Sequence, residues 1–386
     1  MGLRRFFAAA TAAAALLTTG APAAVAEAPP ARTCSRQLGT VTLPNPRAKQ
    51  DAYAWNNAFN SQKVRFFSRT CADLAGTLFW PRSMRPTGLL PGALVLPPSG
   101  GNADQRQVAY IARFLASHGY IVLSADPQGL GDSGVFADPA CGTSLGYSLP
   151  TPCSGVPFQS TDNWMEMARS ALDFFTSRAN PLIARLDTAH IGAAGHSLGA
   201  RVSSYLQDSR FDEGKPNLPS RIAAIVGLDN ISSDYYGDAS AGGGDTYANK
   251  VIVGQPVPGK SVKIHITVPG LGLASDKTSG DPNTKKNAFT RWRNAGVASG
   301  MLVFKGVVHD DFSQSARSDA AMLHRFADYT LAWFDLWLKG DQTATARLLA
   351  RNVEGESVTA LLSPTMRSAF YLPSRGFNCD NWRTGC

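Results

Sequence analysis

The segment Gly195-His196-Ser197-Leu198-Gly199 has the pattern G-x-S-x-G, in which a serine lies between two glycines. The apolar stretch 191–194 precedes it, and residues 200–206 are compatible with a helix. In this strand–turn–helix setting the turn holds the serine in a strained backbone conformation that exposes its hydroxyl. Side chains larger than hydrogen at positions 195 and 199 would collide. The pattern predicts that Ser197 is a nucleophile.

A serine hydroxyl needs a base to become a useful nucleophile at neutral pH. The chain has six histidines. Five of them lie beside Ser197 or within or at the ends of predicted strands and helices: His118, His190, His196, His265 and His324. Only His309 follows a late apolar strand in a segment, residues 305–312, that can form a loop. We therefore expect His309 to be the base.

The imidazole needs a carboxylate that orients it and stabilises its charged form. Asp276 directly follows an apolar strand at residues 271–274, and the order Ser197, Asp276, His309 is the order that the G-x-S-x-G architecture uses. We predict Asp276 as this acid. Asp229, at the end of the strand 222–228, is the main alternative, and Asp281 is a weaker one.

The oxyanion of an acyl-transfer intermediate needs preorganised N–H donors. One donor is expected to be the backbone N–H of Leu198, directly after the nucleophile. The second is expected in the loop 97–102, where we choose Gly101, with Gly100 and Asn102 as alternatives. Glycine permits the close backbone approach that a bound carbonyl requires.

The elements that must position these residues alternate between strands and helices from about residue 76 onward. Apolar strands are predicted near 75–80, 92–96, 120–124, 191–194, 222–226, 271–274 and 301–304. Helices are predicted near 108–116, 164–175, 200–206 and 319–338. Alternation with continuous apolar strands predicts an α/β fold with a mainly parallel central sheet and helices on both faces.

The chain is predicted to form one domain with additions to it. We expect residues 76–340 to be the catalytic domain, with insertions at about 137–157 and 232–260 that are rich in loop-forming residues. Residues 27–75 are expected to wrap the edge of this domain. Residues 341–386 form a C-terminal extension that carries Cys379 and Cys386.

A family resemblance follows from five segments in order. They are Leu96-Pro97-Pro98-Ser99-Gly100-Gly101, Gly119-Tyr120-Ile121-Val122, Asp126-Pro127-Gln128-Gly129-Leu130-Gly131-Asp132-Ser133, Gly195-His196-Ser197-Leu198-Gly199 and Val308-His309. This set resembles the α/β-hydrolase superfamily over roughly residues 75–340. Within it, the chain is similar to secreted bacterial esterases related to dienelactone hydrolases, platelet-activating-factor acetylhydrolases and cutinase-like polyester hydrolases. The resemblance implies the α/β-hydrolase fold and an esterase.

The expected reaction is hydrolysis of a small-molecule or polymeric carboxylic ester through an acyl-enzyme. A peptidase, amidase or acyltransferase with the same triad remains open, as does a binding protein without catalysis. No cofactor or metal is expected. The run Gly129-x-Gly131-x-x-Gly134 matches a dinucleotide fingerprint, but residues 135–141 cannot continue it as the helix that a pyrophosphate requires.

The N-terminus predicts export. Arg4 and Arg5 precede an apolar run at 6–17, and Ala24-Val25-Ala26 fits a cleavage site, so residues 1–26 read as a secretory signal. An anchored N-terminal helix is the alternative, although the run is too short to span a bilayer. We expect a secreted, extracellular protein without stable membrane insertion.

Cysteines and charge agree with this expectation. Six cysteines beyond residue 26 indicate disulfides, for which we predict nearest-neighbour pairing: Cys34–Cys71, Cys141–Cys153 and Cys379–Cys386. No cysteine has metal-ligand spacing. The net charge of +8 favours anionic surfaces, but the basic residues are scattered and match no nucleic-acid-binding motif. No nucleic-acid partner is expected, and we predict a monomer.

Overall fold

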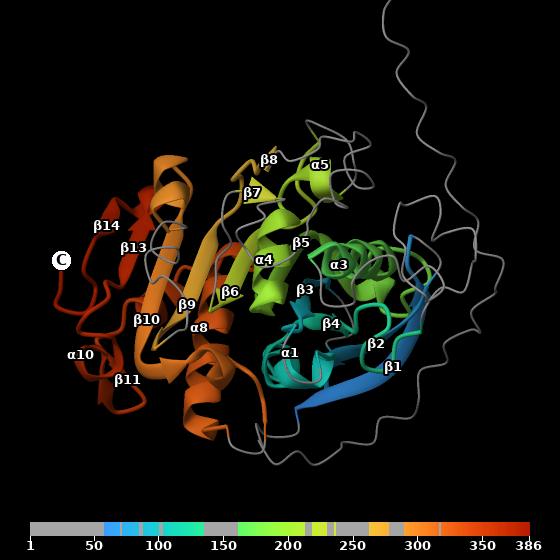
Figure 1. The fold of residues 1–386 in the computed structure, drawn as a ribbon, viewed down its shortest axis with the longest axis horizontal. Helices are drawn as coiled ribbons and strands as arrows, with labels where there is room; N and C mark the ends of the chain where they lie inside the picture. Colours follow the sequence, from blue (N-terminus) through green and yellow to red (C-terminus); the bar gives the residue numbers. More distant parts are fainter. Residues whose placement is uncertain are drawn as a thin grey trace, which may run out of the picture. The chain divides into compact units, whose positions relative to one another are not determined.

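A ten-stranded sheet runs through the part of the chain that the computed structural model describes. This part comprises residues 58–69, 72–84, 88–99, 103–134, 161–212, 218–229, 235–236, 262–277, 289–315 and 318–386. The strands lie side by side in the order β1 (Phe59–Phe67), β2 (Asp73–Pro81), β4 (Ile121–Ala125), β3 (Leu90–Leu96), β5 (Leu186–His196), β6 (Ala224–Leu228), β9 (Gly270–Lys277), β10 (Ser299–Val308), β13 (Ala369–Leu372) and β14 (Phe377–Cys379) (Figure 1). The strands from β4 to β10 pair in parallel. The two strands at each edge are antiparallel to their neighbours.

Helices cover both faces of this sheet. In β3, Ala93 and Val95 pack in one apolar cluster with α1 (Ala109–Ser117) and α8 (Ala320–Leu338). Leu94 and Leu96 pack in a second cluster with α3 (Thr161–Phe175) and α4 (Leu198–Tyr205). This alternation follows from the pleat, because successive side chains of a strand point to opposite faces. The prediction of a mostly parallel central sheet with helices is thus confirmed.

Both edges of the sheet contain strands that the sequence did not predict. Strand β1 comes from the expected edge segment 27–75, and its residues pair with β2 from Phe59↔Pro81 to Phe67↔Asp73. Strands β13 and β14 come from the C-terminal extension and lengthen the sheet beyond β10. Short strands and weakly apolar alternation give little signal in a sequence, so these pairings became visible only in the folded chain.

Shorter elements complete the described part. They are α5 (Ser209–Asp212), α9 (Ala344–Leu348), α10 (Val358–Leu361), η1 (Gln105–Val108), η2 (Ile183–Arg185), η4 (His309–Phe312), η5 (Pro373–Arg375), β7 (Tyr235–Tyr236), β8 (Val262–Lys263), β11 (Asn352–Val353) and β12 (Glu356–Ser357). The sulfur atoms of Cys379 and Cys386 lie 1.98 Å apart, which is the distance of a disulfide. The other four cysteines and the insertion 137–157 lie outside the described residues. So does the insertion 232–260, apart from residues 235–236.

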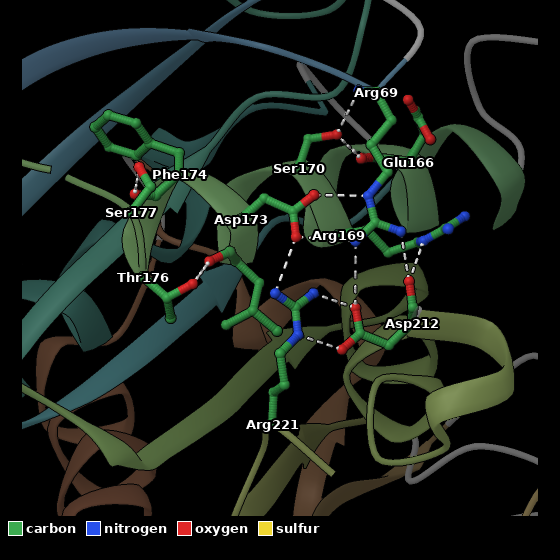
Figure 2. Close-up of polar contacts among 11 residues, drawn as sticks. Arg69, Glu166, Arg169, Ser170, Asp173, Phe174, Thr176, Ser177, Asp212 and Arg221 are labelled. Atoms are coloured by element: carbon green, nitrogen blue, oxygen red, sulfur yellow. Dashed lines mark hydrogen bonds and ion pairs between the residues drawn. The ribbon is translucent and has the colours of Figure 1, made fainter. Parts of the chain in front are cut away.

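A network of arginines and aspartates joins α3 to the segments after β1 and before β6 (Figure 2). Asp173 of α3 accepts from Arg69 Nε at 2.6 Å and from Arg221 Nη1 at 2.9 Å. The Arg221 Nε atom donates to Asp212 at 2.6 Å. Burial opposes the charge on Asp173, but hydrogen bonds and attraction from both arginines outweigh it, so the pKa of this carboxyl lies below its usual value. These alternating charges tie together segments far apart in the chain.

Candidate active site

Ser197 lies at the turn between β5 and α4. Its φ of 55° and ψ of −115° are in a region that residues other than glycine rarely adopt. The Ser197 N–H donates to the carbonyl of Leu228 at 3.0 Å, and the Ser197 carbonyl accepts from Arg201 N at 3.1 Å. Neighbouring β6 and the first turn of α4 therefore fix the main chain of the serine. A strained residue held so firmly is a mark of functional sites.

The glycines on either side of Ser197 are required by close backbone contacts. A Cβ at Gly195 would lie 2.4 Å from the carbonyl carbon of Gly199. A Cβ at Gly199 would lie 2.4 Å from the carbonyl oxygen of Leu96, at the end of β3. Real Cβ atoms do not approach backbone atoms this closely, so the two glycines are needed for the turn, as the sequence predicted.

His309 meets Ser197 at the carboxyl ends of the parallel strands. It directly follows β10 and begins η4, and its Nε2 atom lies 2.9 Å from Ser197 Oγ. The Nδ1 atom is bonded to a carboxylate oxygen of Asp229, directly after β6. The His309 side chain is 40% exposed, whereas that of Asp229 is 1% exposed. Solvent and ligands can thus reach the imidazole, while the acid behind it is shielded from water.

The carboxylate beside His309 belongs to Asp229, and the prediction of Asp276 for this position was wrong. The Asp276 side chain instead accepts a hydrogen bond from Gly306 N at 2.8 Å, where β10 has an irregular register with β9. The reason is the two-residue period of a strand. In β9, Ser275 points toward Asp229, so its neighbour Asp276 points away. Asp281 lies outside the described residues.

Buried side chains pack around the imidazole of His309 and around the segment that carries it. The ring of His196 is 4.7 Å from that of His309 between centroids, and its Nδ1 atom is 2.9 Å from Ser313 Oγ. Phe312 is fully buried in η4. Tyr110 of α1 donates to the Phe312 carbonyl at 3.0 Å, and burial raises the pKa of this phenol, which keeps it a donor. The segment that carries His309 is therefore anchored on the face of the sheet that α1 and α8 cover.

The expected oxyanion donors are only partly within the described residues. Leu198 is the first residue of α4, where the backbone N–H groups have no partner within the helix. Gly101 and its alternatives Gly100 and Asn102 lie outside the described residues. The chain on the near side of that loop is fixed, because Trp164 Nε1 donates to the carbonyl of Pro97 at 2.7 Å.

Asp126 fixes the chain on the far side of the same loop. This carboxylate accepts from the backbone N–H groups of Gln105 and Asp132, at 2.8 and 2.9 Å. Burial raises the pKa of the Asp126 carboxyl, and these hydrogen bonds only partly offset it. The sequence showed Asp126 as part of a motif without revealing this bridging contact, which joins residues 21 positions apart.

Two further findings concern metal ions and membranes. Among the described residues, no group of three or more histidine, cysteine, aspartate or glutamate side chains could hold a metal ion. Within the same ranges, no helix combines the length and the apolar content needed to cross a bilayer.

A comparison with protein-family models found no match for the chain, and a comparison with curated proteins found no relative.

Proposed function

We propose that this protein is a serine hydrolase that cleaves carboxylic esters through an acyl-enzyme. One observation carries the proposal: Ser197 Oγ lies 2.9 Å from one nitrogen of the His309 ring, and buried Asp229 is bonded to the other. A hydroxyl, an imidazole and a carboxylate in this order form the unit that activates a serine for attack on a carbonyl.

The chemistry follows from which ring nitrogen carries the proton. Because Asp229 can only accept at neutral pH, His309 carries its proton on Nδ1, and Nε2 is free to take the proton of Ser197. Ser197 Oγ then attacks the ester carbonyl, and Asp229 stabilises the imidazolium. His309 returns the proton to the leaving alkoxide. Water, activated by the same base, releases the acyl group from the serine.

The oxyanion of the tetrahedral intermediate needs donors that are already oriented. In this proposal the backbone N–H of Leu198 is one of them. The loop that contains Gly101 supplies the other. The chain is fixed on both sides of that loop, at Pro97 by Trp164 and at Gln105 by Asp126, which supports this assignment.

The α/β-hydrolase fold is part of the proposal. It is supported by the order of the parallel strands and by the segments that follow β5, β6 and β10, which carry Ser197, Asp229 and His309. The chain order nucleophile, acid, base is the one that this fold uses, and Asp229 satisfies it as Asp276 would have.

An ester is the proposed substrate because its carbonyl is open to attack by an activated serine, and its alkoxide leaves more readily than the amine of an amide. We also propose that the protein acts outside the cytoplasm after losing residues 1–26, and the disulfide Cys379–Cys386 is in keeping with an oxidising compartment.

Labelling with a fluorophosphonate probe and turnover of p-nitrophenyl butyrate test this function. We expect labelling of the wild type at Ser197. In Ser197→Ala we expect no labelling and turnover that is lower by about 10⁴- to 10⁶-fold, because the hydroxyl that forms the acyl-enzyme is missing. His309→Ala should lose turnover on the same scale.

A second histidine–aspartate pair gives a matched control. His190 Nδ1 lies 2.8 Å from Asp187, but this pair is in the first half of β5, away from Ser197 at the other end of the strand. His190→Ala should keep normal labelling and turnover. A folded wild type that neither labels nor hydrolyses any ester in a panel from acetate to palmitate would contradict the proposed function.

A further inference from the structure

Ser275 makes two hydrogen bonds to the acid of the candidate triad. Its backbone N–H and its hydroxyl both donate to Asp229 Oδ1, each at 2.7 Å. The other carboxylate oxygen, Oδ2, is bonded to His309. Ser275 itself is fully buried. The two oxygens of Asp229 therefore have different partners, and Ser275 holds the one that faces away from the imidazole.

The main chain of Asp229 is also held by β9. Its N–H donates to the carbonyl of Leu273 at 2.6 Å, next to the register pair Leu228↔Leu273. Asp229 has a φ of 58°, which is unfavourable for a residue with a side chain. Such a conformation persists only where neighbours determine it. Strand β9 thus fixes both the backbone and the carboxylate of the residue that directly follows β6.

The kind of donor matters for the chemistry. A carboxylate removed from water must have hydrogen-bond partners, or its charge is too costly to keep. Ser275 supplies two neutral donors, which satisfy Oδ1 without cancelling the negative charge. That charge remains available to stabilise the imidazolium of His309. A cation in the same place would satisfy the oxygen but compete for the charge.

We infer that Ser275 is a positioning residue that fixes the rotamer of the Asp229 carboxylate, so that Oδ2 meets His309 Nδ1. This inference rests on the proposed serine hydrolase function and adds a fourth residue to its machinery. Ser275 acts only through Asp229 and does not touch the reacting atoms. In β9 it occupies the position next to Asp276, at the strand end where the sequence predicted the acid itself.

Ser275→Ala removes the hydroxyl donor and keeps the backbone donor. Loss of a hydrogen bond to a charged group should lower kcat by roughly 10- to 150-fold, with KM unchanged because the substrate contacts are intact. Ser299→Ala is the matched control. Ser299 is an equally buried serine on the adjacent strand β10, at the end remote from His309, and should keep its kcat.

A double-mutant cycle separates positioning from a general structural role. If Ser275 acts through the carboxylate, Ser275→Ala should lower kcat by less than about twofold in a background that already carries Asp229→Asn. An equal loss in both backgrounds would overturn the inference. So would a loss that appears only in KM.

A spectroscopic measurement tests the contact between Ser275 and Asp229 without an activity assay. In the full-length protein at low pH, the proton that His309 Nδ1 shares with Asp229 should give a far-downfield proton NMR signal, assigned by its loss in Asp229→Asn. Ser275→Ala should shift or broaden this signal, and Ser299→Ala should leave it unchanged. An unchanged signal in Ser275→Ala overturns the inference. A shifted signal in a protein without esterase activity would uphold the positioning and refute the proposed function.

Discussion

Asp229 and Asp212 are both buried aspartates, each with a side chain that is 1% exposed, but they have different partners. Asp212 is paired with the guanidinium of Arg221, in a network that also includes Asp173 and Arg69 (Figure 2). Asp229 is bonded to an imidazole and to two neutral donors of a single serine. A buried aspartate is thus held by permanently charged arginines in one region and by an imidazole in the other.

The partners determine what each region can do. A guanidinium does not release its proton in a protein, so the charges around Asp212 stay fixed and only hold segments together. An imidazole gains and loses a proton near neutral pH, so Asp229 can support a proton transfer. The arginine side chains are only partly buried, yet removal of one member would leave the others without full compensation. We therefore expect substitutions at Asp229 to lower turnover and substitutions at Asp212 to lower stability.

The largest effect is expected when the acid beside His309 loses its charge. Asp229→Asn should lower kcat on p-nitrophenyl butyrate by about 10⁴-fold, because an amide no longer stabilises the imidazolium or selects its tautomer. Asp276→Asn keeps an oxygen that can accept from Gly306 N and should change kcat by less than about threefold. The comparison between the two acids breaks down if Asp276→Asn loses as much turnover as Asp229→Asn.

A stability defect without a catalytic defect is expected in the arginine network. Asp212→Ala should lower the free energy of unfolding by up to about 3 kcal/mol, because the partly buried charge of Arg221 is then paired with Asp173 alone. Urea unfolding measures this loss. The folded fraction should hydrolyse the ester at the wild-type rate.

An exposed ion pair provides the control for Asp212. Asp380 is paired with Arg293 at the surface, and its side chain is 63% exposed. Asp380→Ala should change the free energy of unfolding by less than about 1 kcal/mol. A folded Asp212→Ala protein that turned over ester about 100-fold more slowly would show that the two regions are coupled.

The smallest effect is expected in the stability of the protein at acidic pH. The pKa of Asp173 is lowered in the folded protein, so its contribution to stability is present above the unfolded pKa of about 4 and is lost as pH falls through the lower folded pKa. The urea midpoint should therefore decline below about pH 4. Because the Asp173 side chain is 41% exposed, solvent reduces the size of this change.

The test of this pH dependence is Asp173→Asn, which should flatten the decline of the urea midpoint below pH 4 relative to the wild type. Its midpoint at neutral pH should be lower, since the attraction to Arg69 and Arg221 is gone. Identical slopes for the two proteins would show that other carboxyls govern unfolding in acid.

The sequence indicated the sheet, the turn and two members of the site for physical reasons that are local. Strands buried on both faces are continuously apolar, and a serine in a strained turn must have glycines two residues away on each side. Gly195 and Gly199 report that turn directly. His309 could be chosen among six histidines because it alone followed a late strand in a loop-forming segment, and the structure brings it to Ser197.

The acid could not be chosen in the same way. Asp229 and Asp276 both follow parallel strands, and both keep the order nucleophile, acid, base. The two acids differ in the direction of their side chains, because neighbouring residues of a strand point to opposite faces of the sheet. A shift of one residue in the strand register would reverse that direction. Strand β1 was missed because its apolar alternation is weak, and β13 and β14 were missed because they are short. All three depend on the neighbour they pair with.

What the sequence alone determined is therefore the part of the molecule that local sterics and hydrophobic patterning control: an α/β architecture and a serine at a glycine-flanked turn. Tertiary structure decided which carboxylate reaches the imidazole and which donors hold that carboxylate. The reason is that Ser197, Asp229, Ser275 and His309 come from four different strand ends, and only the register of β5, β6, β9 and β10 against one another brings their polar atoms within hydrogen-bonding distance.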